Sequence, residues 1–281
     1  MKIITASFYF LLIIAVGCKN KSQQEVIPAV QDHPTTEELV QPVETEIDED
    51  LETIHVLVAL CDNKYQGIVP VPATIGNGQD ASDNLYWGTA YGIKTYFKRS
   101  KEWNLLKTEK VNEVILERAI FKHATKAVYL IADAYDGQYI KQTTKDFLGF
   151  SSGADKTVLH LESKKIGIGG NANLVAYIGH DGLMDFQLDE HYSNNDGIER
   201  DIIILACFSK SYFEPHLKDS KVNPLVWTTG LMAPEAYTIH DAISGYLAGE
   251  DNEAIRTRAA LAYSKYQKCS ERAARKLLVT N

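Results

Sequence analysis

The chain has 281 residues, of which 45% are hydrophobic and 23% are charged, with 18 Gly and 8 Pro. This composition is typical of a globular protein and excludes collagen-like, low-complexity and wholly disordered chains. The formal net charge of −8 is unevenly spread, because residues 1–21 carry three lysines, whereas residues 22–54 carry ten carboxylates and no Lys or Arg. Residues 55–281 therefore have a net charge of only −1. We expect no nucleic-acid partner, since such binding depends on neutralising phosphates with positive charge.

The N-terminus has the pattern of a secretory signal. Lys2 is followed by fourteen apolar or small residues, 3–16, which are too few to cross a bilayer comfortably. The run ends in Ala15-Val16-Gly17-Cys18, which resembles a bacterial lipobox, the site where the cysteine is lipidated and becomes the new N-terminus. This resemblance implies a membrane partner that is reached through lipidated Cys18. A short anchor or a buried N-terminal helix is the alternative.

The composition divides the chain into three parts. Residues 1–17 are predicted to be the lipoprotein signal peptide. Residues 18–54 are rich in Gln, Glu, Pro and Thr without helix or strand periodicity, which predicts an acidic disordered tether. Residues 55–281 are predicted to form one α/β domain. We therefore expect an envelope protein of a bacterium, anchored to a membrane by Cys18 and facing the periplasm or the cell surface.

Short apolar runs rich in Val and Ile predict the strands of this domain. Near-continuous runs of this kind are typical of strands that are covered on both faces. Four are clear and a fifth is weaker: residues 55–60, 127–132, 174–178 and 201–205, and then 223–229.

Helices are predicted between and after these strands. The predicted helices are residues 86–98, 110–123 and 237–247, followed by a final helix over 255–277 that is capped by Asp251 or Asn252. Strands that alternate with helices indicate an α/β fold with a doubly wound, mainly parallel sheet flanked by helices.

Function in such sheets gathers at the carboxyl ends of the strands. The strand over 174–178 runs into Gly179-His180-Asp181-Gly182, and the strand over 201–205 runs into Ala206-Cys207. We therefore expect His180 and Cys207 to be neighbours. An imidazole beside a thiol can stabilise the thiolate and later protonate a leaving group, as a cysteine nucleophile requires.

An apolar strand ending in His-Gly, followed by one ending in Ala-Cys, resembles the signature of clan CD cysteine peptidases, which include caspases, legumains, gingipains, clostripain and separase. The resemblance implies a caspase-like fold and a peptide or protein substrate. It implies Cys207 as the nucleophile, His180 as the general acid, and the amides of Gly182 and Cys207 as oxyanion donors. The family has Gly directly after the His, whereas Asp181 intervenes here.

Polar residues after the first two strands are candidates for a substrate pocket beside Cys207. These are Asn77, Gln79 and Asp80, together with Asp133. The alternative is a loop whose residues bond to one another, with Trp87 packed on the core. We expect no cofactor and no metal, because the acidic and histidine residues over 180–191 match no ligand spacing.

Two alternatives remain open. A cysteine at the end of a buried strand is often a packed small hydrophobe. The chain is then a catalytically inactive, caspase-like binding lipoprotein that holds a peptide or glycan in the same cleft. Besides Cys18 the chain has Cys61, Cys207 and Cys269. Either Cys61 pairs with Cys269 and leaves Cys207 free, or all three are reduced.

Overall fold

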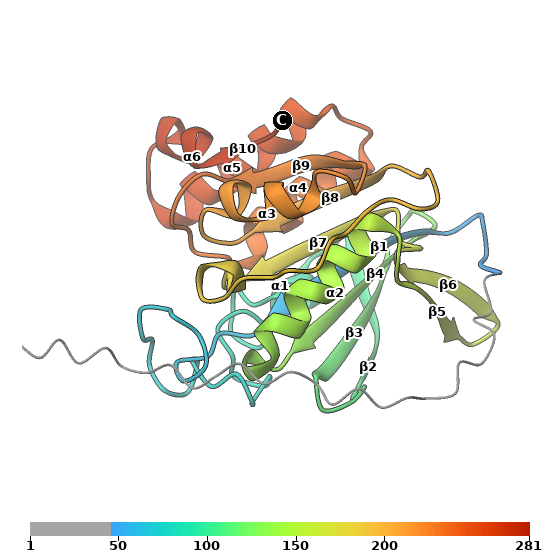
Figure 1. Ribbon diagram of the computed structural model, residues 1–281. Coiled ribbons are helices and arrows are strands. Elements are labelled where there is room, and N and C mark those ends of the chain that lie inside the picture. Colours follow the sequence, from blue (N-terminus) through green and yellow to red (C-terminus); the bar gives the residue numbers. More distant parts are fainter. Residues whose placement is uncertain (1–45) are drawn as a thin grey trace, which may run out of the picture.

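The computed structural model describes residues 46–281 (Figure 1). The predicted signal peptide, the lipidation site at Cys18 and most of the predicted tether lie outside the described residues. Within residues 46–281, no helix combines the length and the apolar character needed to cross a membrane.

An eight-stranded sheet forms the centre of the molecule, in the order β10-β9-β8-β7-β1-β4-β3-β2. The five central strands are parallel: β1 (Glu52–Ala59), β4 (Val128–Tyr135), β7 (Leu174–Gly179), β8 (Arg200–Leu205) and β9 (Val222–Thr228). The outer strands are antiparallel to their neighbours: β3 (Ile115–His123) and the edge strand β2 (Trp103–Glu109) on one side, and the edge strand β10 (Leu278–Val279) on the other. A separate hairpin consists of β5 (Lys156–Leu161) and β6 (Lys164–Gly169).

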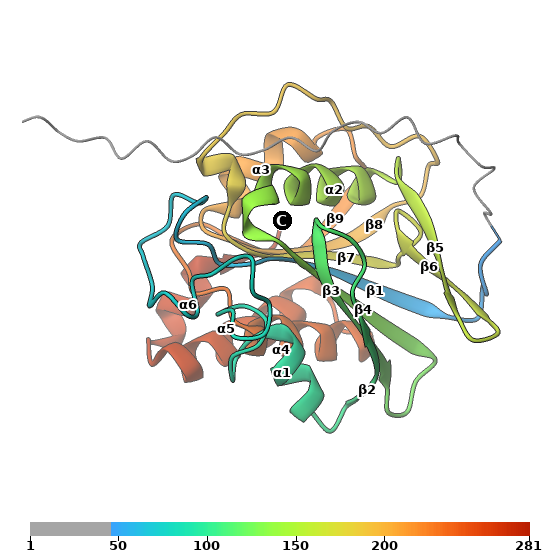
Figure 2. The ribbon, with the colours of Figure 1, turned by 90° about the horizontal axis from the view of Figure 1, so that it is seen from below.

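Helices cover both faces of the sheet (Figure 2). One face carries α2 (Ile140–Ser152) and α3 (Ser209–Leu217); the other carries α1 (Ile93–Arg99), α4 (Ala236–Leu247) and α5 (Asn252–Gln267), with α6 (Glu271–Leu277) beside α5. Alternate residues of β1 enter the two cores, since Val56 and Val58 face α1, α4 and α5, whereas Leu57 and Ala59 face α2 and α3. This burial on both faces explains the continuous apolar runs. The predicted α/β fold with a doubly wound, mainly parallel sheet is confirmed, and the arrangement is consistent with a caspase-like fold.

The five predicted strands are the five parallel strands, with bounds that shift by a few residues. The first begins at Glu52, so it includes residues that we assigned to the tether. The predicted helix over 237–247 is α4, and Asp251 caps α5 by accepting a hydrogen bond from Ala254 N at 2.8 Å.

Three helix predictions were wrong or misplaced. Residues 115–123 form β3 instead of a helix, because Ala119 and Phe121 enter one core and Ile120 enters another, which only a strand allows. The helix predicted over 86–98 begins only at Ile93. The final helix is two, since Lys268 adopts a left-handed conformation (φ 52°) and Ser270 caps α6.

Candidate active site at the carboxyl ends of β7 and β8

The parallel pairing of β7 with β8 brings two chain segments to one edge of the sheet. Ile178 is in register with Leu205, so the residues that follow leave the sheet side by side. Gly179 has φ +141°, and a Cβ there would lie 2.4 Å from the Ala59 carbonyl oxygen. Only glycine fits this close approach, and it turns the chain into His180.

His180 and Cys207 line the same cavity, which has a volume of about 290 Å³. Loops that follow β1, β7 and β9 complete its wall. In Figure 1 the long loop after β1 lies on the side toward which β7 and β8 point. The cavity therefore occupies the place where ligand sites of open α/β sheets are usually found.

The ring of His180 is held by a carboxylate. His180 is 6% exposed, and its Nε2 lies 2.6 Å from Asp185 Oδ2. Gly67 N also donates to this oxygen, at 2.9 Å. Burial alone raises the pKa of Asp185, but the contact with His180 outweighs it, and the pKa lies below its usual value. Asp185 thus orients the imidazole and leaves Nδ1 for a second partner.

The thiol of Cys207 is held by the backbone of the loop after β9. Met232 N lies 3.4 Å from Cys207 Sγ and donates to it. Among the described residues, no hydrogen bond joins Cys207 to His180. Burial raises the pKa of the Cys207 thiol and outweighs the opposing effect of Met232 N–H. Cys207 is therefore a protonated thiol at neutral pH in this structure.

Asp181, directly after His180, is completely buried. Its Oδ1 accepts a hydrogen bond from Leu183 N at 3.0 Å, while Oδ2 has no partner among the described residues. Burial raises the pKa of Asp181 to about 7. The charged form of Asp181 adds to the effect of burial in raising the pKa of Cys207.

Gly182, a predicted oxyanion donor, lies in the short turn Gly182–Met184. Its carbonyl oxygen accepts a hydrogen bond from Asp185 N at 2.9 Å, and the Tyr177 hydroxyl donates to His180 O at 2.6 Å. Gly179, and not Gly182, is among the described residues that line the cavity. Gly182 thus takes part in holding the turn after β7.

The structure places the four predicted pocket residues away from the Cys207 cavity. Gln79 Nε2 donates to Asp62 and Asp136 at 2.6 and 2.7 Å, and Gln79 N donates to Asn77. Asp133 is buried in β4, where it binds Arg118 and His55. Asp80 lines a different cavity, beside β2 and β3.

These contacts agree with the alternative prediction, in which the residues of the loop bond to one another and Trp87 packs on the core. Trp87 is fully buried in the core, and its Nε1 donates to Glu117 at 2.9 Å. Gln79 binds the carboxylates that follow β1 and β4, and Asn84 Nδ2 donates to Cys61 O and Asn77 O. The loop is therefore a packed structural unit whose apolar stretch, not its polar one, reaches Cys207.

Sequence reasoning missed this apolar stretch and the role of Asp185. Ile68, Val69 and Val71 line the cavity. Their signal was available, since Val69 and Val71 alternate with Pro70 and Pro72, and proline removes the donors that a central strand needs. The prolines thus indicate that these apolar residues do not belong to a central strand of the sheet.

Cys61, Cys207 and Cys269 are all free thiols. Within residues 46–281, no three His, Cys, Asp or Glu side chains are arranged to hold a metal ion.

Comparisons of the chain with protein-family models, curated proteins and solved structures found no match. Two features of the molecule therefore bear on its function: the doubly wound α/β sheet, and a cavity lined by both a histidine and a cysteine at the ends of adjacent strands.

Proposed function

We propose that the protein is a cysteine peptidase that resembles clan CD enzymes, with Cys207 as nucleophile and His180 as general acid. One observation carries the proposal: both side chains line one cavity at the carboxyl ends of adjacent parallel strands. The contact of Asp185 with His180 supports it further, because a base that is oriented by a third group is typical of nucleophilic sites.

The chemistry runs in two halves. Cys207 Sγ forms a bond to the substrate carbonyl carbon while its proton passes to His180. The C–N bond then breaks as His180 gives this proton to the departing amine. The acyl part of the substrate stays bound to Cys207 Sγ as a thioester. Water attacks the thioester and gives a proton to His180; the acid departs, and the proton returns to Cys207. Because burial raises the pKa of Cys207, proton transfer must accompany the attack.

The alternative is a non-catalytic binding protein that uses the same cavity. It is favoured by the raised pKa of Cys207 and by the hydrogen bond that Cys207 Sγ accepts from Met232 N, since no hydrogen bond joins Cys207 to His180 among the described residues. A buried, protonated thiol is typical of an unreactive cysteine, because the thiolate is the nucleophile.

Replacement of the nucleophile separates the two functions. We expect Cys207→Ala in the full chain to lower peptide hydrolysis by at least about 10³-fold, the scale of loss when a nucleophile is removed. The measurement is cleavage of a mixed peptide library, followed by mass spectrometry. Cys269→Ala, which removes a free thiol outside this cavity, is the matched control and should keep full activity. Equal hydrolysis by Cys207→Ala would refute the peptidase, and binding without hydrolysis by the unaltered chain would favour the binding protein.

We also propose that the protein is exported and anchored to a bacterial membrane through lipidated Cys18. The pattern of residues 1–18 supports this. In cells fed labelled palmitate, the unaltered chain should carry label, and Cys18→Ser should lose it. Cys269→Ser should retain the label. Label that persists in Cys18→Ser would exclude this anchor.

A further inference from the structure

The wall of the Cys207 cavity is mostly apolar. The loops after β1, β7 and β9 contribute Ile68, Val69, Val71, Met184, Leu231 and Met232. Of the described residues that line the cavity, none is Asp, Glu, Lys or Arg. Its volume of about 290 Å³ is at the lower end for ligand sites, which suits a single side chain better than an extended ligand.

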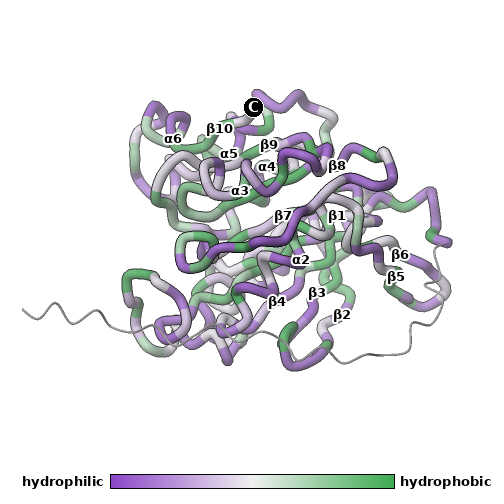
Figure 3. Tube along the Cα trace, in the orientation of Figure 1, coloured by the Kyte–Doolittle hydropathy of each residue, from purple (hydrophilic) through white to green (hydrophobic). Residues whose placement is uncertain are grey.

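Several of these apolar side chains are exposed to solvent. Val69 is 88% exposed, Leu231 is 70% exposed and Met184 is 39% exposed. Single exposed apolar residues are common, but three around one cavity mark a binding site. Figure 3 shows hydrophobic residues on the loop after β1, which projects from the body of the molecule.

Two carboxylates at the edge of this cavity, Asp185 and Glu235, already have partners. Asp185 accepts from His180 and Gly67. Glu235, next to the lining residue Pro234, accepts hydrogen bonds from Tyr237 and Gln267 at 2.8 and 3.0 Å. A charged substrate side chain would lose its hydration here without gaining an ion pair, which is unfavourable.

We propose that this cavity binds an apolar side chain of a peptide, such as Leu, Met or Phe, next to the bond that Cys207 attacks. The inference rests on the proposed peptidase function and names its substrate class. Removal of the exposed rim from water favours such a side chain, and the lack of a charged lining residue disfavours Asp, Lys or Arg at the same position.

The test measures cleavage by the full chain in detergent. The substrates are peptides that differ only in the residue before the bond, which is Leu, Met, Phe, Asp, Lys or Arg. We expect kcat/KM for the apolar set to exceed that for the charged set by at least about tenfold, the scale on which an apolar pocket discriminates. Preferred cleavage beside Asp, Lys or Arg would overturn the inference and leave the peptidase function standing.

A binding measurement keeps the two proposals distinguishable. The full chain with Cys207→Ala is titrated with the Leu and Asp peptides by calorimetry. If the unaltered chain cleaves nothing but this variant binds the Leu peptide at least about tenfold more tightly, the peptidase function fails and the apolar preference holds. If it cleaves nothing and the two peptides bind equally or not at all, both proposals fail.

A charge placed on the rim should reverse the preference. Leu231→Glu adds a carboxylate at an exposed position, so it should keep the fold and lower kcat/KM for the Leu peptide by about tenfold, while raising it for the Lys peptide. Leu261→Glu, on an exposed position of α5, is the control and should change neither value. An equal effect of the two variants, or no effect of Leu231→Glu, contradicts the placement of the substrate side chain.

Discussion

At the scale of single residues, Asp181 is the most unusual group near the site. Its carboxyl group is completely buried, and Oδ2 has no partner among the described residues. The pKa of Asp181 is raised by burial to about 7 from 3.8. The protonated form is therefore favoured by the fold, and the charged form is disfavoured.

The raised pKa predicts how Asp181 affects stability as pH changes. The contribution of Asp181 is most favourable below pH 4, where the group is protonated in both the folded and the unfolded chain. It is lost as pH rises through about 7, because folding then requires a buried charge. Asp181→Asn keeps an oxygen that can accept from Leu183 N but carries no charge.

We therefore expect Asp181→Asn to raise the free energy of unfolding at pH 8 by an amount on the order of a few kcal/mol, with no gain at pH 4. Urea unfolding of both chains from pH 4 to 8 measures this difference. Asp83→Asn removes an exposed carboxylate and serves as control. A gain that is the same at both pH values would mean that the charge of Asp181 is not its cause.

At the scale of elements, a strand could be predicted from the sequence when both of its faces are buried. The parallel strands β1, β4 and β7 are covered on both faces, and each is a recognisable apolar run. The edge strand β2 is not, since most of its residues are at least partly exposed and include Lys107, Thr108 and Glu109. Its place in the sheet depends on pairing with β3, which no local pattern records.

The division between α5 and α6 is likewise not recorded in any local sequence pattern. Apolar residues continue at helical spacing through residues 255–277, with no Gly or Pro to stop the helix. The helix nevertheless ends at Gln267, where Lys268 takes a left-handed conformation that favours glycine. Packing of α6 on α5, together with the hydrogen bond from Thr229 N to Leu277 O at the end of α6, outweighs the local preference.

The candidate site was predictable to the extent that it depends on strand ends. His180 and Cys207 follow apolar runs directly, and parallel register carries both to one edge. The cavity wall was not predictable, because it depends on contacts between distant loops, such as Gly67 N with Asp185 across 118 residues. Composition alone does not say which side of a loop faces a cavity.

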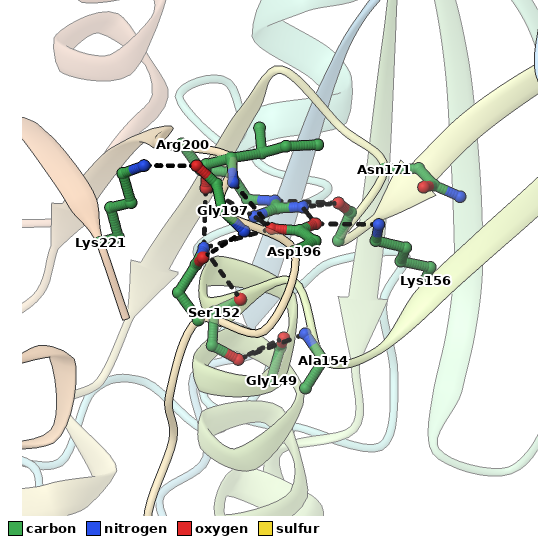
Figure 4. Close-up of polar contacts among 12 residues, drawn as sticks. Gly149, Ser152, Ala154, Lys156, Asn171, Asp196, Gly197, Arg200 and Lys221 are labelled. Carbon is green, nitrogen blue, oxygen red and sulfur yellow. Dashed lines mark hydrogen bonds and ion pairs between the residues drawn. The ribbon is translucent and has the colours of Figure 1, made fainter. Parts of the chain in front are cut away.

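At the scale of the whole molecule, the end of the sheet away from the candidate site has its own anchor. Arg200 opens β8, is 2% exposed, and lies among the residues shown in Figure 4. Its guanidinium donates to Gly170 O before β7, to Asp196 and to Ile198 O. Asn194, in the same loop, donates to Ser152 O at the end of α2. Arg200 and Asn194 together thus tie two strands, a loop and a helix end to one another.

This anchor predicts a change in stability without a change in the site. Arg200→Met removes the guanidinium and leaves Gly170 O without its buried donors, so we expect a loss of about 2–4 kcal/mol at pH 7. For a domain of this size, Tm should fall by about 4–16 °C. Peptide hydrolysis per folded molecule should not change, because Arg200 and Cys207 lie at opposite ends of β8.

The pH dependence identifies the ion pair as the cause. Hydrogen bonds from Arg200 hold the pKa of Asp196 well below its usual value, despite the opposing effect of burial. A lowered pKa contributes stability above the unfolded value of about 4, and this part is lost as pH falls toward the folded value. Thermal melts should therefore show the difference between the unaltered chain and Arg200→Met shrinking from pH 6 to pH 3. Lys156→Met removes the more exposed partner of Asp196, which lies 2.8 Å away, and should cost less than about 1 kcal/mol. If both variants lose stability equally, or if the loss for Arg200→Met grows as pH falls, the Arg200–Asp196 pair is not what anchors this end of the sheet.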